Sequence, residues 1–245
     1  MTRLSELRQE VRNLIEQYPD ERIVRFEFDQ KVYWLKNFAI HERKDFLKAG
    51  TRRAMLREIR MLRKFNSLGV PVPPIILASG HHLVLGDIGT TLNRILPESS
   101  GEERTALLKL AAQALATLHQ QDLVHGRPAL RDLAYDGENI YFLDFESASF
   151  GRNLATAKAW DLFAFINSIF RERYLGMKEA RRALLDYMAT NANASATARY
   201  WRKTFNKYRL LRPIIRYGPF KGKDITAILG VFHLLYDEKN IWQKK

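Results

Sequence analysis

The chain has 245 residues, 46% of them apolar, which is enough to bury a sizeable core in one domain or in two small lobes. It contains no cysteine, which excludes a disulfide framework and a thiolate metal site and favours a cytoplasmic location. Its 40 Lys and Arg residues against 27 Asp and Glu residues give a net charge of +13, which favours anionic partners. No window approaches the roughly 18 consecutive apolar residues of a membrane span, so we expect a soluble protein that binds a membrane at most peripherally.

The first third of the chain predicts a short helix followed by a small sheet. Apolar residues recur at helical spacing at the start and again before Gly69, and β-branched or aromatic runs lie between and after them. The dipeptide Asp29-Gln30 between two such runs predicts a hairpin. The expected segments are a helix over 4–15, strands over 23–28 and 31–36, one or two helices over 45–66, and two short strands in IILASG and HHLVLGDIG.

Beyond Gly89 the sequence predicts mostly helices. Ser100 and Glu103 have the spacing of a capping box before a broad apolar stripe, and residues 159–170 are apolar nearly all round, as in a central helix. Further helices are expected near 177–190, 196–211 and 224–240. The sequence therefore predicts an α+β fold in a single domain, 1–245, with a small β-rich N-lobe over about 20–89, a helical C-lobe over about 90–245, and a cleft near Ile88–Leu92.

The most specific pattern is VHGRPALRDLAYDGENIYFLDFES, residues 124–147. His125, Arg127 and Asp132 come first, then a predicted hairpin, then Asp144-Phe-Glu. Over about 23–170 the chain resembles the protein-kinase-like fold, above all the bacterial lipopolysaccharide kinases (Kdo and heptose kinases) and the Bud32 and Rio-type small kinases. These families carry His-x-Asp-x-x-x-x-Asn before the hairpin and Asp-Phe-Gly or Asp-Phe-Glu after it.

The register of this motif decides which residue stands for the catalytic base. If Arg131-Asp132 were the Arg-Asp of a kinase loop, the metal-ligand position would fall at Gly137, in the middle of the turn, and the hairpin before Asp144 would not fit. The spacing rejects that register. Asp132 then occupies the position of the metal-binding asparagine, where a carboxylate also binds a hard cation, and Arg127 replaces the usual catalytic aspartate.

The resemblance implies a site for ATP and Mg²⁺. By resemblance, Asp132 and Asp144 bind the metal, and Lys36 contacts the α- and β-phosphates, held by Glu58 in the next helix. The segment of Gly86, Asp87 and Ile88 is expected to offer backbone hydrogen bonds to adenine.

Asp161 and four histidines complete the expectations. Asp161, in an apolar helix, is expected to brace the backbone of the catalytic loop, since a buried charge needs hydrogen bonds; the alternative is that it caps its helix. We expect His125 to be a packing residue that shapes the loop. His119, together with His81 and His82, has no partner that the sequence identifies.

Two departures from the family pattern bear on function. The hairpin RFEFDQKVYWLK has no glycine, so the phosphate-covering loop of ordinary protein kinases is replaced by a short turn, which argues against tight ATP binding. Arg127 removes the base, which typically costs about 10²–10⁴ in rate. Phosphoryl transfer depends chiefly on positioning and electrostatics, so this loss slows the chemistry without forbidding it. Arg127 can instead neutralise a phosphoryl group or an anionic acceptor.

Three functions fit these features. The favoured one is an ATP- and Mg²⁺-dependent phosphotransferase acting on an acidic sugar or lipid-linked acceptor, cytoplasmic and in peripheral contact with the inner membrane face. The basic and aromatic run 199–216 suits an anionic glycolipid or membrane, or is simply an amphipathic core helix. The alternatives are a nucleotide-binding pseudokinase that regulates a partner, and a Bud32-like RNA-associated kinase, although nucleic acid is the less favoured partner because no usual RNA-binding motif is visible.

Overall fold

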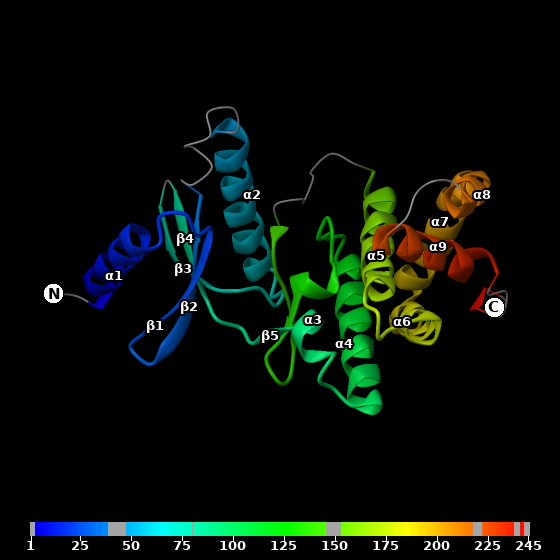
Figure 1. The fold of residues 1–245 in the computed structure, drawn as a ribbon, viewed down its shortest axis with the longest axis horizontal. Helices are drawn as coiled ribbons and strands as arrows, with labels where there is room; N and C mark the ends of the chain where they lie inside the picture. The colour runs from blue at the N-terminus through cyan, green and yellow to red at the C-terminus, as the bar shows by residue number, and fades with distance from the viewer. Residues whose placement is uncertain are drawn as a thin grey trace. The chain divides into compact units, whose positions relative to one another are not determined.

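The fold is described from a computed structural model (Figure 1), which covers residues 3–38, 48–79, 81–145, 153–217, 222–237 and 241–242. Contacts divide the chain into two compact units, Met1–Gly89 with Leu143–Ser147, and Thr90–Phe142 with Ala148–Lys245. The first holds a small antiparallel sheet and the second is mostly helical, which confirms the α+β fold class. That the two units form one kinase-like domain stays a prediction.

The first unit contains a four-stranded antiparallel sheet in the order β1-β2-β4-β3. The predicted hairpin is present: Asp29 and Gln30 join its strands with φ angles of 52° and 60°. Two consecutive residues with positive φ are typical of the tight type I′ turn, and strand pairing continues up to Phe28 and Lys31 on either side. The strands are β1 (Ile23–Phe28), β2 (Lys31–Asn37), β3 (Ile75–Ala78) and β4 (His82–Gly86).

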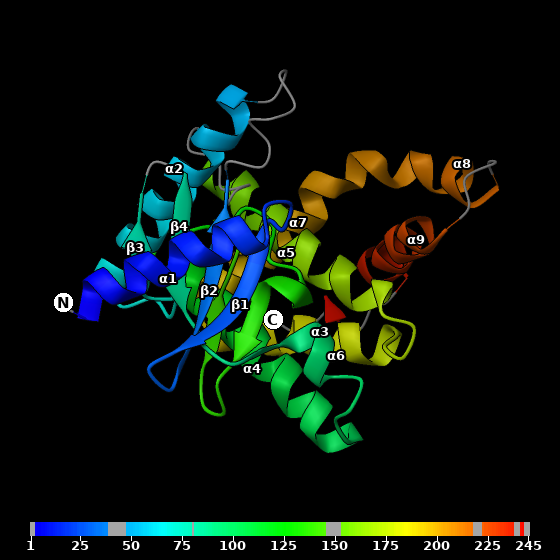
Figure 2. The same ribbon diagram turned by 60° about the vertical axis from the view of Figure 1, so that its left-hand side comes forward.

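Two helices, α1 (Arg3–Gln17) and α2 (Lys48–Ser67), cover opposite faces of this sheet (Figures 1 and 2). The buried face of α1 packs against β-strand side chains that include Tyr33 and Leu35. Side chains alternate along a strand, so Trp34 and Lys36 point to the other face, where α2 lies. The alternation of β2 therefore separates a hydrophobic face from a face that carries polar groups. The predicted helix start at 45–47 lies outside the described residues.

The second unit is built around α5 (Leu154–Arg171), which is buried among neighbouring helices and contacts α6, α7 and α9. A three-stranded sheet of order β5-β6-β7 precedes it. The predicted capping box is confirmed, because Ser100 and Glu103 cap each other at the start of α4. The other elements are β5 (Thr90–Thr91), α3 (Leu92–Ile95), α4 (Gly101–Gln120), η2 (Leu130–Asp132), β6 (Leu133–Tyr135), β7 (Ile140–Phe142), α6 (Met177–Thr190), α7 (Ala192–Phe205), η4 (Asn206–Leu211), α8 (Arg212–Tyr217) and α9 (Lys223–Tyr236).

The main departure from the predicted elements is the helix expected over 196–211. It begins four residues earlier, because the side chain of Asn191 accepts a hydrogen bond from the Ala194 amide and caps α7. It ends at Phe205 and continues as the 3₁₀ segment η4. The part of the last predicted helix over 238–240 lies outside the described residues. Among the helices in the described ranges, none is long and apolar enough to cross a membrane.

Candidate active site

A buried ion pair joins the sheet of the first unit to α2. Lys36 Nζ donates to Glu58 Oε1 at 2.5 Å, and the side chains are 15% and 1% exposed. The second oxygen, Glu58 Oε2, is buried and has no hydrogen-bond partner within the described part of the chain. A buried carboxylate with one cation as its partner holds that cation firmly, because separating them leaves a charge in a medium of low polarity. The pairing expected from the resemblance is therefore present.

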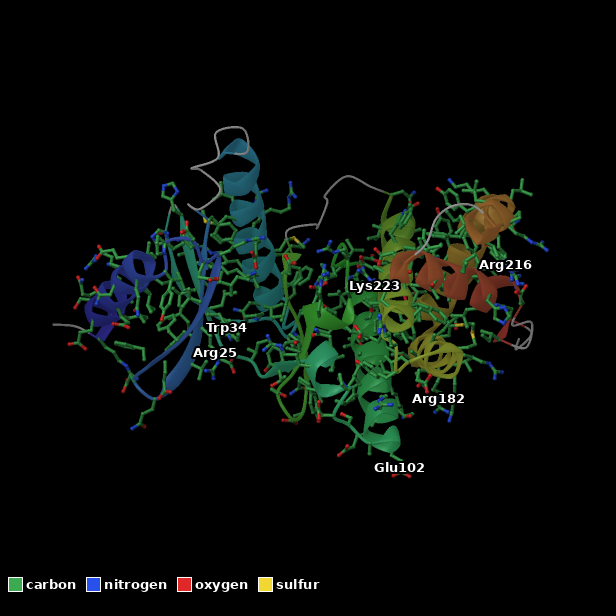
Figure 3. All side chains as sticks on the ribbon, viewed as in Figure 1. Arg25, Trp34, Glu102, Arg182, Arg216 and Lys223 are labelled. Carbon is green, nitrogen blue, oxygen red and sulfur yellow. The ribbon has the colours of Figure 1, made fainter. Side chains whose placement is uncertain are left out.

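Trp34 lies on the same face of β2 as Lys36, two residues before it, and no pattern in the sequence marked it as a site residue. It is half-buried and lies beside Arg25 of the paired strand (Figure 3). Its Nε1–H donates to Asp87 Oδ1 at 2.6 Å, and Asp87 Oδ2 accepts from the Gly89 amide at 3.2 Å. Asp87 therefore anchors an indole ring next to the ion pair.

The segment expected to bind adenine already uses two of its amide donors. The Gly86 amide donates to the Pro74 carbonyl at 3.0 Å, and the Asp87 amide donates to the Val32 carbonyl at 3.1 Å. Both bonds belong to the edge of the sheet. Both amides therefore already donate within the sheet. A nucleotide's adenine bound at this segment would have to use the Ile88 amide or the carbonyl oxygens, each of which can accept a second hydrogen bond.

Asp161 braces the loop that follows α4, as predicted. Its Oδ2 accepts from the His125 amide at 2.6 Å and its Oδ1 accepts from the Gly126 amide at 2.8 Å. The carboxylate is fully buried, seven residues into α5, and the side chain of Asn153 caps that helix instead. The cap alternative is therefore wrong. The brace binds backbone groups only, so it does not depend on which side chain follows at position 127.

His119 proves to have two partners. It is fully buried, its Nδ1 lies 2.6 Å from the Tyr187 hydroxyl, and its Nε2 lies 3.4 Å from Asp161 Oδ2. Burial lowers the pKa of His119 below its ordinary value, and it outweighs the opposing effect of Asp161. Burial likewise raises the pKa of Tyr187. A neutral imidazole therefore lies next to the Asp161 carboxylate that holds the loop. The signal was available, since His119 lies four residues after Leu115 on the buried stripe of α4, and a buried polar side chain needs partners.

Within the loop, Arg127 is exposed and its backbone is fixed. The Arg127 amide donates to His125 Nδ1 at 3.3 Å, and the Arg127 carbonyl accepts from the Ala129 amide at 3.0 Å. His125 is buried with its ring centroid 5.8 Å from that of Phe142, which confirms its packing role. The guanidinium therefore starts from an anchored backbone and lies at the surface.

Asp132 closes the loop at the start of the β6–β7 hairpin. It is 4% exposed, its Oδ2 accepts from the Ala129 amide at 3.3 Å, and its Oδ1 lies 3.6 Å from Arg131 Nε. Two residues earlier, the Leu130 amide donates to the Ser168 hydroxyl on α5 at 3.1 Å. The carboxylate of Asp132 therefore lies close to the guanidinium of its chain neighbour, Arg131.

Asp144 follows β7 and has a φ angle of 58°. A left-handed backbone is uncommon for residues other than glycine, and such strain gathers at functional sites. The next side chain, Phe145, is fully buried and meets Phe65 of α2 edge-on, with ring centroids 4.9 Å apart. That contact places Asp144 in the first unit together with Lys36 and Glu58. Within the described ranges no group of three or more His, Cys, Asp or Glu side chains forms a ready metal cluster.

These features define the class: the fold is protein-kinase-like and the protein is a kinase-like phosphotransferase. The model of the phosphotransferase enzyme family matches residues 21–193, most of the chain, and the chain belongs to this family. An uncharacterised protein of Haemophilus influenzae is 30% identical over 94% of this chain and 96% of its own length.

Two further similarities are of different kinds. The Bud32 subunit of the EKC/KEOPS complex of Encephalitozoon cuniculi is 30% identical over 46% of this chain and 56% of its own. The solved complex of APH(2")-IIa with streptomycin and ATP aligns with 97% of this chain and 96% of that one, at 12% identity and a TM-score of 0.48. The general resemblance to kinase-like proteins is confirmed, whereas membership of the lipopolysaccharide kinase group stays a prediction.

Proposed function

We propose that the protein transfers the γ-phosphoryl group of ATP, with Mg²⁺, to a hydroxyl of an anionic sugar or lipid-linked acceptor. The observation that carries this proposal is the buried pair of Lys36 and Glu58. A lysine fixed by one carboxylate keeps two further N–H donors, and those can bind phosphate oxygens. A purely structural ion pair at this depth would contribute little stability, so a ligand-binding role explains it better.

The residues around Lys36 fit a nucleoside triphosphate. Alternate residues on a strand lie about 7 Å apart, so a nucleotide with its phosphates at Lys36 can stack its base on the Trp34 indole, which Asp87 anchors. Stacking on an aromatic ring is tolerant of base identity. With the Gly86 and Asp87 amides already occupied, we expect base selectivity to be weak and to rest on Ile88 and nearby carbonyl oxygens.

Asp132 and Asp144 are the residues that would hold Mg²⁺. Carboxylate oxygens are the donors this ion prefers; Asp144 has a strained backbone and Asp132 is held in a buried turn. When bound, the ion supplies charge neutralisation between phosphate oxygens.

Arg127 supplies positive charge where the family has a base. Its backbone is fixed by the His125 ring and its side chain is exposed, so the guanidinium can bind a phosphoryl oxygen or an acidic group of the acceptor with two parallel hydrogen bonds. An acceptor hydroxyl then loses its proton to solvent or to the leaving phosphate oxygens. The reaction is slower than with an aspartate, but the positioning and charge that dominate phosphoryl transfer remain.

The net charge of +13 and the basic run over 199–216 support an anionic acceptor. The similarity to Bud32 proteins favours a second candidate, a kinase that works within an assembly as KEOPS complex subunits do. The exchange at Arg127 favours a third, a pseudokinase that binds nucleotide without turnover.

One experiment separates these functions. The purified protein is incubated with Mg²⁺ and γ-labelled ATP, alone, with lipopolysaccharide core fragments, and with structured RNA or protein substrates, and the labelled product is identified. Label on the core fragment supports the proposal. Label on protein alone favours the assembly kinase. No label, combined with calorimetric binding of Mg·ATP that Lys36→Met weakens, identifies the pseudokinase; an absence of nucleotide binding at millimolar concentration rejects all three.

A further inference from the structure

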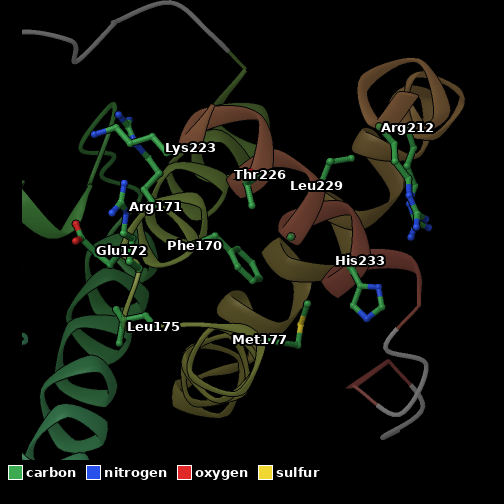
Figure 4. Close-up of a pocket in the computed structure, with 13 residues that line it drawn as sticks. Phe170, Arg171, Glu172, Leu175, Met177, Arg212, Lys223, Thr226, Leu229 and His233 are labelled. Atoms are coloured by element: carbon green, nitrogen blue, oxygen red, sulfur yellow. The ribbon is translucent and has the colours of Figure 1, made fainter. Parts of the chain in front are cut away.

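The second unit contains a pocket of about 720 Å³ that the functions above do not use. It is formed by the end of α5, the connection to α6, and helices α8 and α9 (Figure 4). Its volume lies in the range of sites for drug-sized ligands, about 300–1,000 Å³. Phe170, the first lining residue, comes nine residues after Asp161 on α5, which is about 14 Å along the helix axis. The pocket is therefore separate from the loop that Asp161 braces.

The middle of the pocket is apolar. Phe170, Leu229 and Met177 lie there in Figure 4, between two charged ends. A Cβ atom on Gly230 would lie 2.6 Å from the Phe170 ring, so the glycine allows α9 to pack directly on that ring. This packing makes the apolar floor a firm surface.

The two ends of the pocket differ in how their cations are compensated. At one end, Arg212 donates two hydrogen bonds to Asp237, at 3.0 and 2.5 Å, and His233 Nδ1 lies 2.8 Å from the same carboxylate. The bonds from Arg212 hold the pKa of Asp237 below its ordinary value. That pair therefore stays ionised and its charges cancel, while Arg216, one turn further along α8, also lines the pocket and interacts with another group.

The other end carries an excess of positive charge. Arg171, Glu172 and Lys223 lie there in Figure 4, Arg173 follows Glu172 in the chain and also lines the pocket, and Arg171 pairs with Asp224 at 3.0 Å. Among the described residues, Arg173 and Lys223 form no ion pair. Lys223 also stands in the first turn of α9, where the helix dipole favours an anion over a cation. An anion bound here would relieve both the repulsion between the cations and that with the dipole.

We propose that this pocket binds an anionic amphiphile, with its phosphate-like head at Arg173 and Lys223 and its alkyl chain along Phe170 and Leu229. The length of the apolar floor next to a cationic end fits a molecule with one charged head and one apolar tail. The inference does not require that the protein transfer phosphate, because the pocket lies on the second unit alone.

The test uses octyl phosphate as the probe, below its micelle concentration, in calorimetry with the full chain and no nucleotide. Octyl glucoside has the tail without the charge, and inorganic phosphate has the charge without the tail. We expect octyl phosphate to bind at least about tenfold more tightly than either, because each buried methylene adds about twofold to fourfold in affinity and charged hydrogen bonds add to that. Butyl phosphate should bind more weakly than octyl phosphate.

Two charge reversals provide the matched comparison. Lys223→Glu should weaken octyl phosphate binding about tenfold, whereas Lys203→Glu, an equally exposed change on α7 outside the pocket, should leave it unchanged. A melting temperature recorded for both variants identifies any loss of folding, and Leu229→Asn should weaken octyl phosphate more than butyl phosphate. Equal binding of octyl glucoside, equal binding of inorganic phosphate, equal effects of the two reversals, or no binding at millimolar concentration would each overturn the inference.

Vesicles of phosphatidylglycerol and of phosphatidylcholine distinguish the source of the amphiphile. Co-sedimentation with the anionic vesicles that Lys223→Glu reduces identifies a membrane lipid, while octyl phosphate binding without co-sedimentation identifies a soluble amphiphile. Failure of ATP binding in the earlier experiment leaves these results unaffected, and failure here leaves ATP binding unaffected.

Discussion

Glu58 in the first unit and Asp161 in the second are both buried carboxylates, but their hydrogen-bond donors are of different kinds. Glu58 holds a side-chain cation, Lys36, whereas Asp161 holds two backbone amides. A cation can be shared with a ligand, so Glu58 holds a group that is able to bind one. Every residue type except proline has the same backbone N–H, so Asp161 preserves the shape of a loop and leaves its side chains free to change. The comparison predicts that the loop keeps its shape whichever side chain stands at position 127.

The largest expected effect is at the two aspartates whose side chains act directly. Asp144→Ala and Asp132→Ala should each lower phosphotransfer by about 10³-fold or more through loss of metal binding. Asp144→Asn is the control for backbone strain, because asparagine tolerates a positive φ, and it should be nearly as inactive. Asp132→Asn should retain most activity. The measurement is turnover of γ-labelled ATP across a range of Mg²⁺ concentrations; full activity of Asp144→Asn would show that this carboxylate is not a metal ligand.

Asp161 tests the other side of the comparison. Asp161→Asn leaves one of the two loop amides facing an NH₂ group, so we expect a loss of about 3 kcal/mol in the free energy of unfolding. The control is Asp224→Asn, which removes a 3.0 Å pair with Arg171 between side chains that are 65% and 38% exposed and should cost less than about 1 kcal/mol. Urea unfolding measures both. Equal losses would mean that the brace contributes no more than a surface ion pair.

Substitutions at Arg127 separate catalysis from stability, because they should lower turnover and leave the free energy of unfolding nearly unchanged. Arg127→Ala should lower turnover about tenfold or more, with Arg127→Lys between it and the wild type, while the free energy of unfolding changes by less than about 0.5 kcal/mol. Arg127→Asp should lower turnover further by crowding carboxylates, and Asp132→Asn should recover part of it. If Arg127→Asp alone increased turnover, the site would be that of an ordinary kinase that has lost its catalytic base.

The smallest effect concerns the histidine behind the brace. Burial lowers the folded-state pKa of His119 from its ordinary value of 6.5, so the unfolded state binds more protons at acidic pH. Stability from this group is complete above about pH 6.5 and is lost as the pH falls from there through the folded pKa. The groups that face the ring are Asp161, Tyr187 and Lys158. Melting temperatures from pH 8 to 5 should fall less steeply for His119→Gln than for the wild type; parallel curves would contradict this.

The sequence predicted much of this arrangement, for reasons that particular residues make clear. The hairpin followed from Asp29-Gln30 between two β-rich runs, and the Asp161 brace followed from a charge in an apolar helix. Trp34 was missed because its partner, Asp87, is brought near only by the pairing of β2 with β4. His119 was missed because Tyr187 is 68 residues away in the chain. Local patterns predict elements, whereas contacts between distant residues depend on packing.

The tight turn at Asp29 and Gln30 also bears on how long a nucleotide stays bound. Ladder hydrogen bonds reach the last residues on both sides of the turn, so the hairpin has no slack with which to fold over a bound phosphate chain. This hairpin therefore does not serve as a lid, and we expect exchange of nucleotide to be fast compared with chemistry, with a KM that approximates the true dissociation constant. Such a protein would sample the ratio of ATP to ADP in its surroundings from moment to moment, rather than retain the last nucleotide it met.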